Sequence, residues 1–260
     1  YTIGQMVTVS DNSGPLTNTG YAFAGWMTKI DGTGTSYAAA ATFAMGTTDV
    51  TLCAVWIPNN LIFTSSGSSI DITGYATTPS GSLTIPVGVT GLGNQVFQSC
   101  NGLTEVILPS SLGSIGDNAF INCQSLSTVT IPAKVGSIGI FAFGSCNNLT
   151  GIFVDANSSH FQSIAGMLYS KDGSILIQVP GKTTGAIVIP SGVTTISSYA
   201  LMSCYNVSSV TISASVATIG NSAFNACFGL SSIDLPANLT SIGTAAFASC
   251  LNLTSINVSP

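Results

Sequence analysis

The sequence predicts a β-rich solenoid, a rod of stacked coils in which each coil corresponds to about 23 residues. The first observation is the spacing of six of the seven cysteines, which lie 23, 23, 58, 23 and 23 residues apart, at Cys100, Cys123, Cys146, Cys204, Cys227 and Cys250. The second is that prolines and phenylalanines follow the same period, at Pro86, Pro109 and Pro132 and at Phe97, Phe120, Phe143, Phe224 and Phe247. A fixed period of this length is typical of repeat proteins, in which each coil buries its apolar side against its neighbours.

The composition excludes two classes of partner. Charged residues make up 5% of the chain, against about 25% in an average protein, while the hydrophobic fraction is an ordinary 45%. The chain has four basic residues and a net charge of −5. Nucleic-acid binding requires a stripe of Lys and Arg, so we expect no nucleic-acid partner. No apolar run approaches the roughly 18 residues of a transmembrane span, so we expect no membrane insertion in this segment.

Residues 1–57 do not follow the period, which indicates a separate small module in front of the solenoid. A short strand is expected at 7–9. The alternation from 50 to 56 predicts a half-buried strand whose four inward side chains are those of Val50, Leu52, Ala54 and Trp56.

Two stretches of this module, GYAFAGW (Gly20–Trp26) and the segment Asp31–Trp56, resemble the Listeria–Bacteroides repeat, also called the internalin-type B repeat. The resemblance implies a β-grasp-like fold. The first strand of that family would precede Tyr1, so the resemblance also implies that the module is incomplete here.

Residues 58–81 are expected to form a hairpin that bridges the module and the first coil. Two short apolar strands, Leu61–Phe63 and Ile70–Ile72, flank a turn rich in serine and glycine. Such a hairpin would cap the solenoid, because an open end leaves apolar side chains and backbone groups unpaired.

The unit Leu103–Cys123 shows the pattern of the repeats. Its strand turns Val106 and Leu108 inward and ends at Pro109, where the missing N–H group is tolerated. The segment Asn118–Phe120 is expected to form a short helical turn on the convex side of the coil. We therefore expect one strand and one helical turn in each coil.

This pattern, LxxVxLPxxLxxIGxxAFxxC, resembles the BspA-like, or Treponema-type, leucine-rich repeat, and the resemblance covers residues 82–260. It implies a leucine-rich-repeat solenoid with a period of 23 residues. The resemblance further implies a bacterial protein that is secreted or displayed on the cell surface, and a role in adhesion.

One coil carries an insertion. Its proline position is occupied by Asp155, and the next proline of the series, Pro190, follows 35 residues later, which exceeds the period by 12 residues. Within 155–190, the apolar runs Met167–Tyr169 and Ile175–Val179 flank an Asp-Gly turn. An apolar run on each side of such a turn predicts a β-hairpin.

The outward positions of the strands form the candidate binding face, because side chains alternate along a strand. The face comprises Glu105, Ile107, Thr128, Thr130, Phe153, Ser209, Thr211, Ser232, Asp234, Ser255 and Asn257. Most members are small and polar, with an apolar end at Ile107 and, beside it, Phe153. Exposed aromatic residues mark contacts more often than serine does, so Phe153 is the strongest candidate. The alternative interpretation is a solvated strand face with good β-propensity.

The cysteines and the single histidine do not indicate a reactive site. Cysteines at one repeat position stack with parallel side chains, which favours buried free thiols over disulfides. No CxxC pair is present for zinc, and Cys53 lies outside the series. His160 has Asp155 and Asp172 near it in sequence, but no GxSxG motif accompanies it, so an exposed loop histidine is expected. We expect no catalytic, cofactor-binding or metal-ligating residues and no enzymatic activity.

Three non-enzymatic functions remain open. The leading hypothesis is an extracellular adhesion or protein-interaction module of a bacterial surface or secreted protein, whose partner is a protein on a host or neighbouring cell. The alternatives are a glycan-binding module that uses the Ser, Thr and Asn ladder, and a structural spacer that presents other domains. The last coil ends in an uncapped strand edge, so we expect either a truncated array or end-to-end self-association through that edge.

Overall fold

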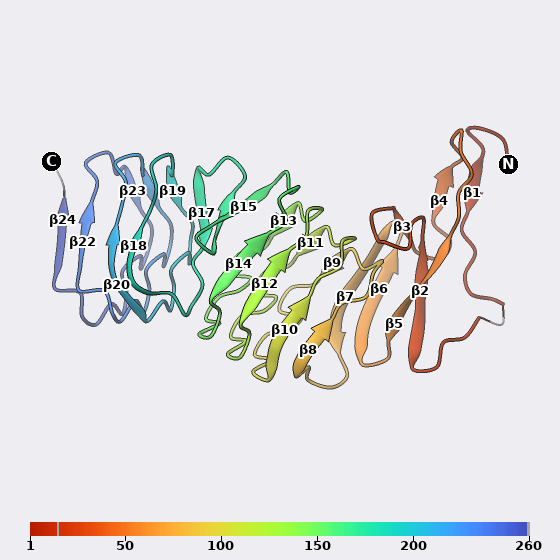
Figure 1. The fold of residues 1–260 in the computed structure, drawn as a ribbon, viewed down its shortest axis with the longest axis horizontal. Coiled ribbons are helices and arrows are strands. Elements are labelled where there is room, and N and C mark those ends of the chain that lie inside the picture. The colour runs from red at the N-terminus through yellow and green to blue at the C-terminus, as the bar shows by residue number, and fades with distance from the viewer. Residues whose placement is uncertain (15, 259–260) are drawn as a thin grey trace.

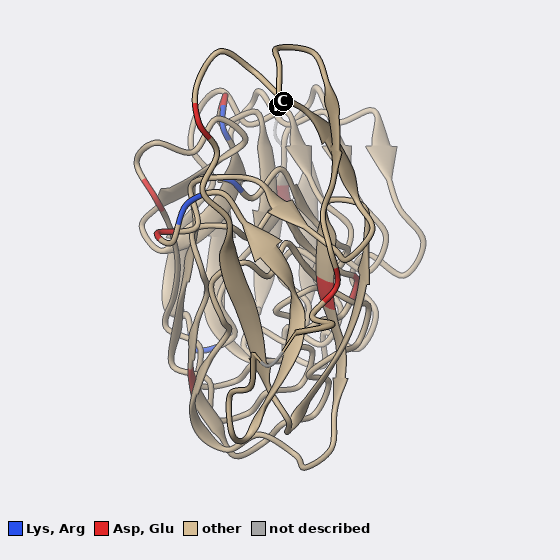
Figure 2. Ribbon diagram, turned by 90° about the vertical axis from the view of Figure 1, so that its right-hand side faces the viewer, with Lys and Arg blue, Asp and Glu red and all other residues tan. Residues whose placement is uncertain are grey.

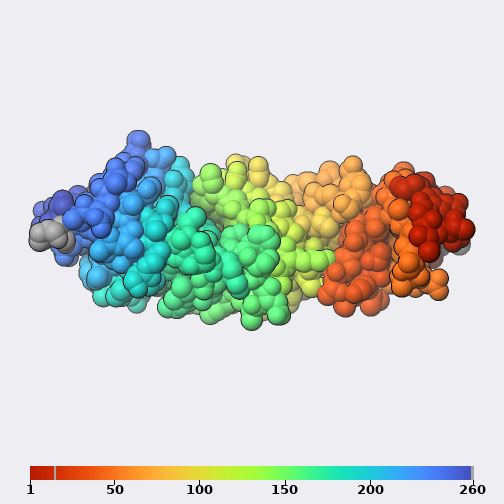
Figure 3. Space-filling model, turned by 90° about the horizontal axis from the view of Figure 1, so that it is seen from above, coloured from red at the N-terminus to blue at the C-terminus, as the bar shows by residue number. Residues whose placement is uncertain are grey.

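The computed structural model describes residues 1–14 and 16–258 and shows an elongated rod of stacked strands (Figure 1). The chain advances steadily from the N-terminal module at one end to the last coil at the other (Figure 3). None of the described residues forms a helix, so none provides a helix with the length and apolar character needed to cross a lipid bilayer. The predicted β-rich solenoid is therefore confirmed, whereas its short helical turns are not present.

Each coil before the last contributes a strand to a first row and a second strand to a second row, and the last described coil contributes to the first row only. The first row consists of β8 (Gly81–Thr84), β10 (Leu103–Ile107), β12 (Thr128–Ile131), β14 (Gly151–Val154), β18 (Thr184–Val188), β20 (Asn206–Thr211), β22 (Ser232–Leu235) and β24 (Ser255–Val258). The second row consists of β9 (Gly91–Leu92), β11 (Ser114–Ile115), β13 (Ser137–Ile138), β17 (Ile175–Gln178), β19 (Thr195–Ile196), β21 (Thr218–Ile219) and β23 (Ser241–Ile242). Paired strands within a row are parallel, and residues one period apart lie opposite each other, as Thr130 and Phe153 do.

The convex side of each coil is a run of turns where a helical turn was expected. In the second coil, Asn118 and Asn122 have positive φ angles of 55° and 61°. These two residues and Phe120 between them donate their backbone N–H groups to carbonyls of the next coil, over 2.8 to 3.0 Å. A helix would use the same N–H groups internally. The turns instead form a third ladder of hydrogen bonds between coils, which we call the turn ladder.

The core contains stacked phenylalanine rings and the cysteine series. The ring of Phe120 lies between those of Phe97 and Phe143, with centroids 5.3 and 5.5 Å away. All seven cysteines are free, and the Cys123 thiol donates to the carbonyl of Phe97 over 3.1 Å. Burial raises the pKa of the Cys204 thiol to about 12. The expectation of buried free thiols in the series is confirmed, although Cys250 in the last described coil is only half-buried.

The N-terminal module contains two small antiparallel sheets, and a hairpin follows it. One sheet has the order β3-β2-β5 and the other pairs β1 with β4. Their bounds are β1 (Met6–Thr8), β2 (Tyr21–Met27), β3 (Ser36–Tyr37), β4 (Thr42–Ala44) and β5 (Cys53–Pro58). The described part of the module has no helix to cover its sheet, so the β-grasp-like fold is not confirmed. Strands β6 (Leu61–Ser66) and β7 (Ser69–Tyr75) form the hairpin, and β7 pairs in parallel with β9.

The predicted inward face of the last module strand is wrong by one residue. Val55 and Ile57 of β5 are buried, with 1% and 0% of their surface exposed, while Val50 is exposed and Trp56 half-buried. Val55 packs so closely on the first coil that a Cβ atom at Gly88 would lie 2.6 Å from its methyl group. Contact with the solenoid therefore decides which side of β5 is buried, and the isolated alternation could not show it.

The module is docked onto the solenoid through its loop at 29–35. The Lys134 ammonium group donates to the carbonyls of Gly32 and Gly34 over 3.3 and 2.7 Å. The Ser110 hydroxyl donates to the carbonyl of Asp31 over 2.5 Å. Module, hairpin and first coils thus share one hydrophobic core that extends from Ala24 to Leu168.

The long coil adds a second hairpin, β15 (Phe161–Ile164) with β16 (Met167–Ser170), which we call the insertion hairpin. The predicted hairpin of β16 and β17 is confirmed, because these strands pair antiparallel. Alternate side chains of β16 face two different cores: Leu168 joins the first, and Met167 and Tyr169 join a second. The insertion hairpin therefore divides the solenoid into an N-terminal block (81–154) and a C-terminal block (175–258).

Candidate binding face

The first row of strands presents outward side chains in every coil. Ile107 and Phe153 have 48% and 47% of their surface exposed. Glu105, Thr128, Thr130, Thr211, Ser232, Asp234, Ser255 and Asn257 are exposed as well, whereas Ser209 is half-buried. The pleat of each strand explains this, because the alternate residues Val106, Val129 and Ile152 fill the core.

The candidate residues form two patches where one continuous ladder was expected. Strand β14 pairs only with β12, and β18 begins a separate four-stranded sheet with β20, β22 and β24. The strands before the long coil form two two-stranded sheets, β8 with β10 and β12 with β14, and the long coil separates both from the four-stranded sheet. The first patch therefore belongs to the N-terminal block and the second to the C-terminal block, and a single partner residue cannot contact both.

A shallow hollow of about 330 Å³ lies in the N-terminal patch. Its lining includes the exposed apolar side chain of Ile107 and the hydroxyls of Thr128 and Thr130. Two carboxylates also line it, those of Glu105 and Asp155. The Ser82 hydroxyl donates to Glu105 over 2.7 Å, and the backbone N–H of Asn157 donates to Asp155 over 2.8 Å. The hollow is thus apolar in part and acidic, with its carboxylates held in place.

Phe153 does not lie directly beside Ile107, which corrects the expected arrangement. Thr130 is the register partner of Phe153, and Ile107 lies one period before Thr130. The two apolar side chains are therefore separated by one coil, or roughly 10 Å at two strand spacings. The ring of Phe153 covers Gly151, where a Cβ atom would lie 2.7 Å from the ring, so this glycine is buried although its position faces outward.

The C-terminal patch is mostly polar, and one side-chain hydrogen bond joins two of its members. The amide of Asn257 donates to the carboxylate of Asp234 over 2.8 Å. One apolar residue of this patch was missed, Val188, with 64% of its surface exposed. It precedes Pro190 by two residues, as Ile107 precedes Pro109, so the repeat period could have located it.

The described residues provide no reactive constellation. His160 is exposed, and its Nδ1 lies 3.0 Å from the hydroxyl of the neighbouring Ser159. Asp172 is engaged by Ser170 and Ser174, whose hydrogen bonds hold the pKa of its carboxyl below the usual range. Within 1–14 and 16–258, no three His, Cys, Asp or Glu side chains converge to hold a metal ion. Figure 2 shows that the few charged residues are scattered and form no patch of one sign.

Comparison with protein families finds two matches that together cover most of the chain. The family described as the BspA type leucine rich repeat region matches residues 68–175 and 181–260, in six copies. The Listeria-Bacteroides repeat domain family matches residues 1–55. None of the curated proteins compared with this chain matches it significantly.

Several solved structures are similar to this one. A leucine rich cell surface protein from Faecalibacterium prausnitzii is 29% identical, with a TM-score of 0.56. The likeness covers 70% of this chain and 60% of the length of that protein. A leucine-rich repeat protein from Eubacterium ventriosum is 22% identical, with a TM-score of 0.52 over 79% of this chain and 69% of its own. The T. pallidum leucine rich repeat protein is 24% identical, with a TM-score of 0.51 over 75% of this chain and 88% of its own. The latter two likenesses concern the fold alone.

Proposed function

Because this chain belongs to the BspA-type leucine-rich repeat family, we propose that it is a non-enzymatic protein-interaction module that acts in adhesion at a bacterial surface. The similar protein from Faecalibacterium prausnitzii is described as a cell surface protein, which supports an extracellular location. We also propose the division into a Listeria–Bacteroides module at 1–57, a capping hairpin at 58–81 and a repeat array at 82–260.

The observation that carries this proposal is the N-terminal patch of the first strand row. Two large apolar side chains, Ile107 and Phe153, are half-exposed on a face otherwise made of small polar groups. The carboxylates of Glu105 and Asp155 line the hollow beside Ile107. Exposed apolar residues beside a hollow are typical of interaction surfaces. The proposed partner is therefore a protein segment that inserts an apolar side chain and carries a basic or hydroxyl group next to it.

A binding screen of the whole chain against extracellular-matrix proteins and a glycan panel tests this function. We expect a saturable protein ligand whose affinity falls about 30-fold in Phe153→Ser, since interface hot spots contribute about 2 kcal/mol or more. The matched control is Val188→Ser, which removes an exposed apolar side chain from the other patch and should leave the affinity unchanged.

Three results would contradict the proposal. Equal losses in the two variants would mean that the N-terminal patch has no special role. A glycan ligand that depends on Asp234 and Asn257 would favour the glycan-binding alternative, and the absence of any ligand would favour a structural spacer.

A further inference from the structure

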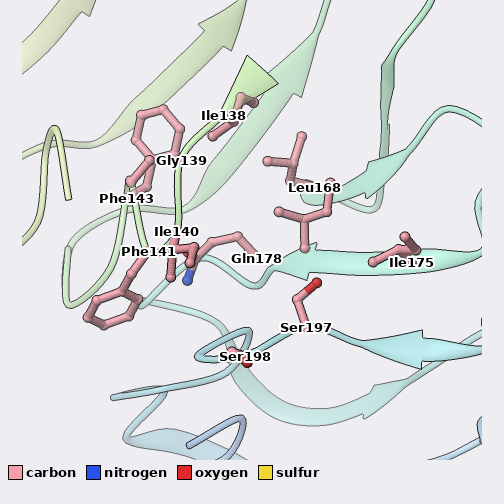
Figure 4. A pocket seen from close by; sticks show the side chains of 12 residues that line it. Ile138, Gly139, Ile140, Phe141, Phe143, Leu168, Ile175, Gln178, Ser197 and Ser198 are labelled. Carbon is pink, nitrogen blue, oxygen red and sulfur yellow. The ribbon is translucent and has the colours of Figure 1, made fainter. Parts of the chain in front are cut away.

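The insertion hairpin leaves a second pocket, away from the strand face, which we call the seam pocket. It has a volume of about 330 Å³ and lies between the last coil of the N-terminal block and the first of the C-terminal block (Figure 4). Its lining is mostly apolar and includes Ile138, Ile140, Phe141, Phe143, Leu168, Ile175 and Ile177. Such a volume lies at the small end of the range for ligand pockets.

One polar side chain in this pocket has no partner. Gln178, at the end of β17, has 5% of its surface exposed, and no hydrogen bond from the described residues engages its amide group. The side chain extends toward Ile140 and Phe141 at the pocket wall (Figure 4). The amide therefore faces the pocket with its hydrogen-bonding capacity free for a ligand.

Two backbone N–H groups at the seam pocket also lack a hydrogen-bond acceptor. In the preceding coil, Asn118 and Phe120 donate their N–H groups to Ile140 and Ala142 of the next coil. The equivalent donors one coil further are Phe141 and Phe143, and among the described residues neither N–H group has an acceptor.

The missing acceptors belong to the first coil of the C-terminal block. By the register of the turn ladder, Phe141 would pair with the carbonyl of Ser198, and Phe143 with that of Ala200. The Ala200 carbonyl instead accepts from Val179 over 2.8 Å, and the Ser198 carbonyl has no partner among the described residues. The turn ladder is therefore interrupted at the seam pocket, with free donors on one wall and a free acceptor on the other.

We propose that the seam pocket binds an extended, uncharged peptide segment with one apolar side chain. An extended peptide has carbonyl groups for the N–H groups of Phe141 and Phe143, and an N–H group for the carbonyl of Ser198, so it would restore the interrupted ladder by strand addition. The amide of Gln178 would bond a further peptide group. No charged residue lines the pocket, which disfavours a charged side chain at this position.

The test is a titration of the whole chain with the blocked peptide acetyl-Ala-Leu-Ala-amide, followed by NMR chemical shifts. We expect saturable shifts confined to the seam pocket, with a dissociation constant of about 0.1–1 mM for a ligand of this size. Gln178→Leu keeps the side-chain volume and removes the amide, so binding should fall at least tenfold.

Three controls make the result decisive. Acetyl-Ala-Asp-Ala-amide should not bind, Ser197→Phe should block the pocket, and Phe153→Ser on the strand face should leave the titration unchanged. Equal binding of the aspartate peptide, unaltered affinity in Gln178→Leu, or the absence of saturable shifts at the pocket would each overturn the proposal. The strand-face function would survive any of these results, because it depends on different residues.

Discussion

The two blocks of the solenoid are built from the same repeat but present different surfaces. The residue after the cysteine is polar in the N-terminal block, at Asn101, Gln124 and Asn147, and apolar in the C-terminal block, at Tyr205, Phe228 and Leu251. The strand face shows the opposite trend, with Ile107 and Phe153 in the first block and a polar ladder through most of the second. The repeat therefore determines the inward positions, while the outward positions differ between coils that have the same shape.

The blocks also differ in what supports them. The core of the N-terminal block continues into the module and the capping hairpin, whereas the core of the C-terminal block is separate. Strand β13 of the second row pairs with β11 but not with β17, so the insertion hairpin interrupts this row as well. Because coils in a solenoid stabilise only their neighbours, the blocks should respond separately to the loss of a core residue.

The largest expected effect comes from removing one buried ring in each block. Phe120→Ala and Phe224→Ala each empty a fully buried site, so each should lower the free energy of unfolding by about 3–5 kcal/mol. Both tryptophans, Trp26 and Trp56, belong to the module that shares the first core. Urea unfolding followed by tryptophan fluorescence should therefore shift in Phe120→Ala and remain unchanged in Phe224→Ala, while circular dichroism detects both losses. Identical fluorescence shifts would show that the two blocks unfold as one unit.

A smaller effect is expected at the cysteine series, because the distance from thiol to carbonyl acceptor differs between the coils before and after the insertion hairpin. The Cys123 thiol lies 3.1 Å from its carbonyl acceptor, but the Cys204 thiol lies 3.9 Å from the carbonyls of Val179 and Pro180. In Cys123→Ser the shorter hydroxyl stays within reach of the Phe97 carbonyl, and stability should change little. In Cys204→Ser the hydroxyl has no acceptor, and we expect a loss of about 1–3 kcal/mol. Equal thermal midpoints for the two variants would refute this difference.

The smallest effect should come from the contact that ties the module to the N-terminal block. Lys134→Ala removes two hydrogen bonds to the loop at 29–35, and we expect a loss of about 1 kcal/mol. The loss should be visible in tryptophan fluorescence during urea unfolding. Lys182→Ala in the exposed start of the C-terminal block is the matched control and should leave that transition in place. A shift of the same size in the control would exclude a specific role for Lys134.

Much of the fold was predictable because it repeats. The period located the strands that turn Val106, Val129 and Ile152 inward, the buried thiols and the hairpin around the Asp-Gly turn. The convex turns were not predictable from the same pattern. The pattern of residues 118–122 suits a helical turn as well as turns with left-handed residues at Asn118 and Asn122, and the N–H groups that decide between them bond to a different coil.

The candidate site was predictable only in part. Alternation identified the exposed positions of the strand face, including Ile107 and Phe153, but not its division into two patches. That division depends on where the insertion hairpin lies between the coils. Gln178 gave no signal, because glutamine in a strand is unremarkable until its neighbours are seen to leave its amide unpaired.

The sequence by itself determined the coil, its core and the family. An inward side chain stacks on the equivalent residue of the next coil, so the same residue type is required at that position in every repeat. The tertiary structure alone decided which face of β5 is buried, where the two cores separate and where the turn ladder is interrupted. These features arise where the period fails, at the module and at the insertion. There each residue contacts a segment that is not its copy, so the neighbours that decide its burial and hydrogen bonds are known only once the chain has folded.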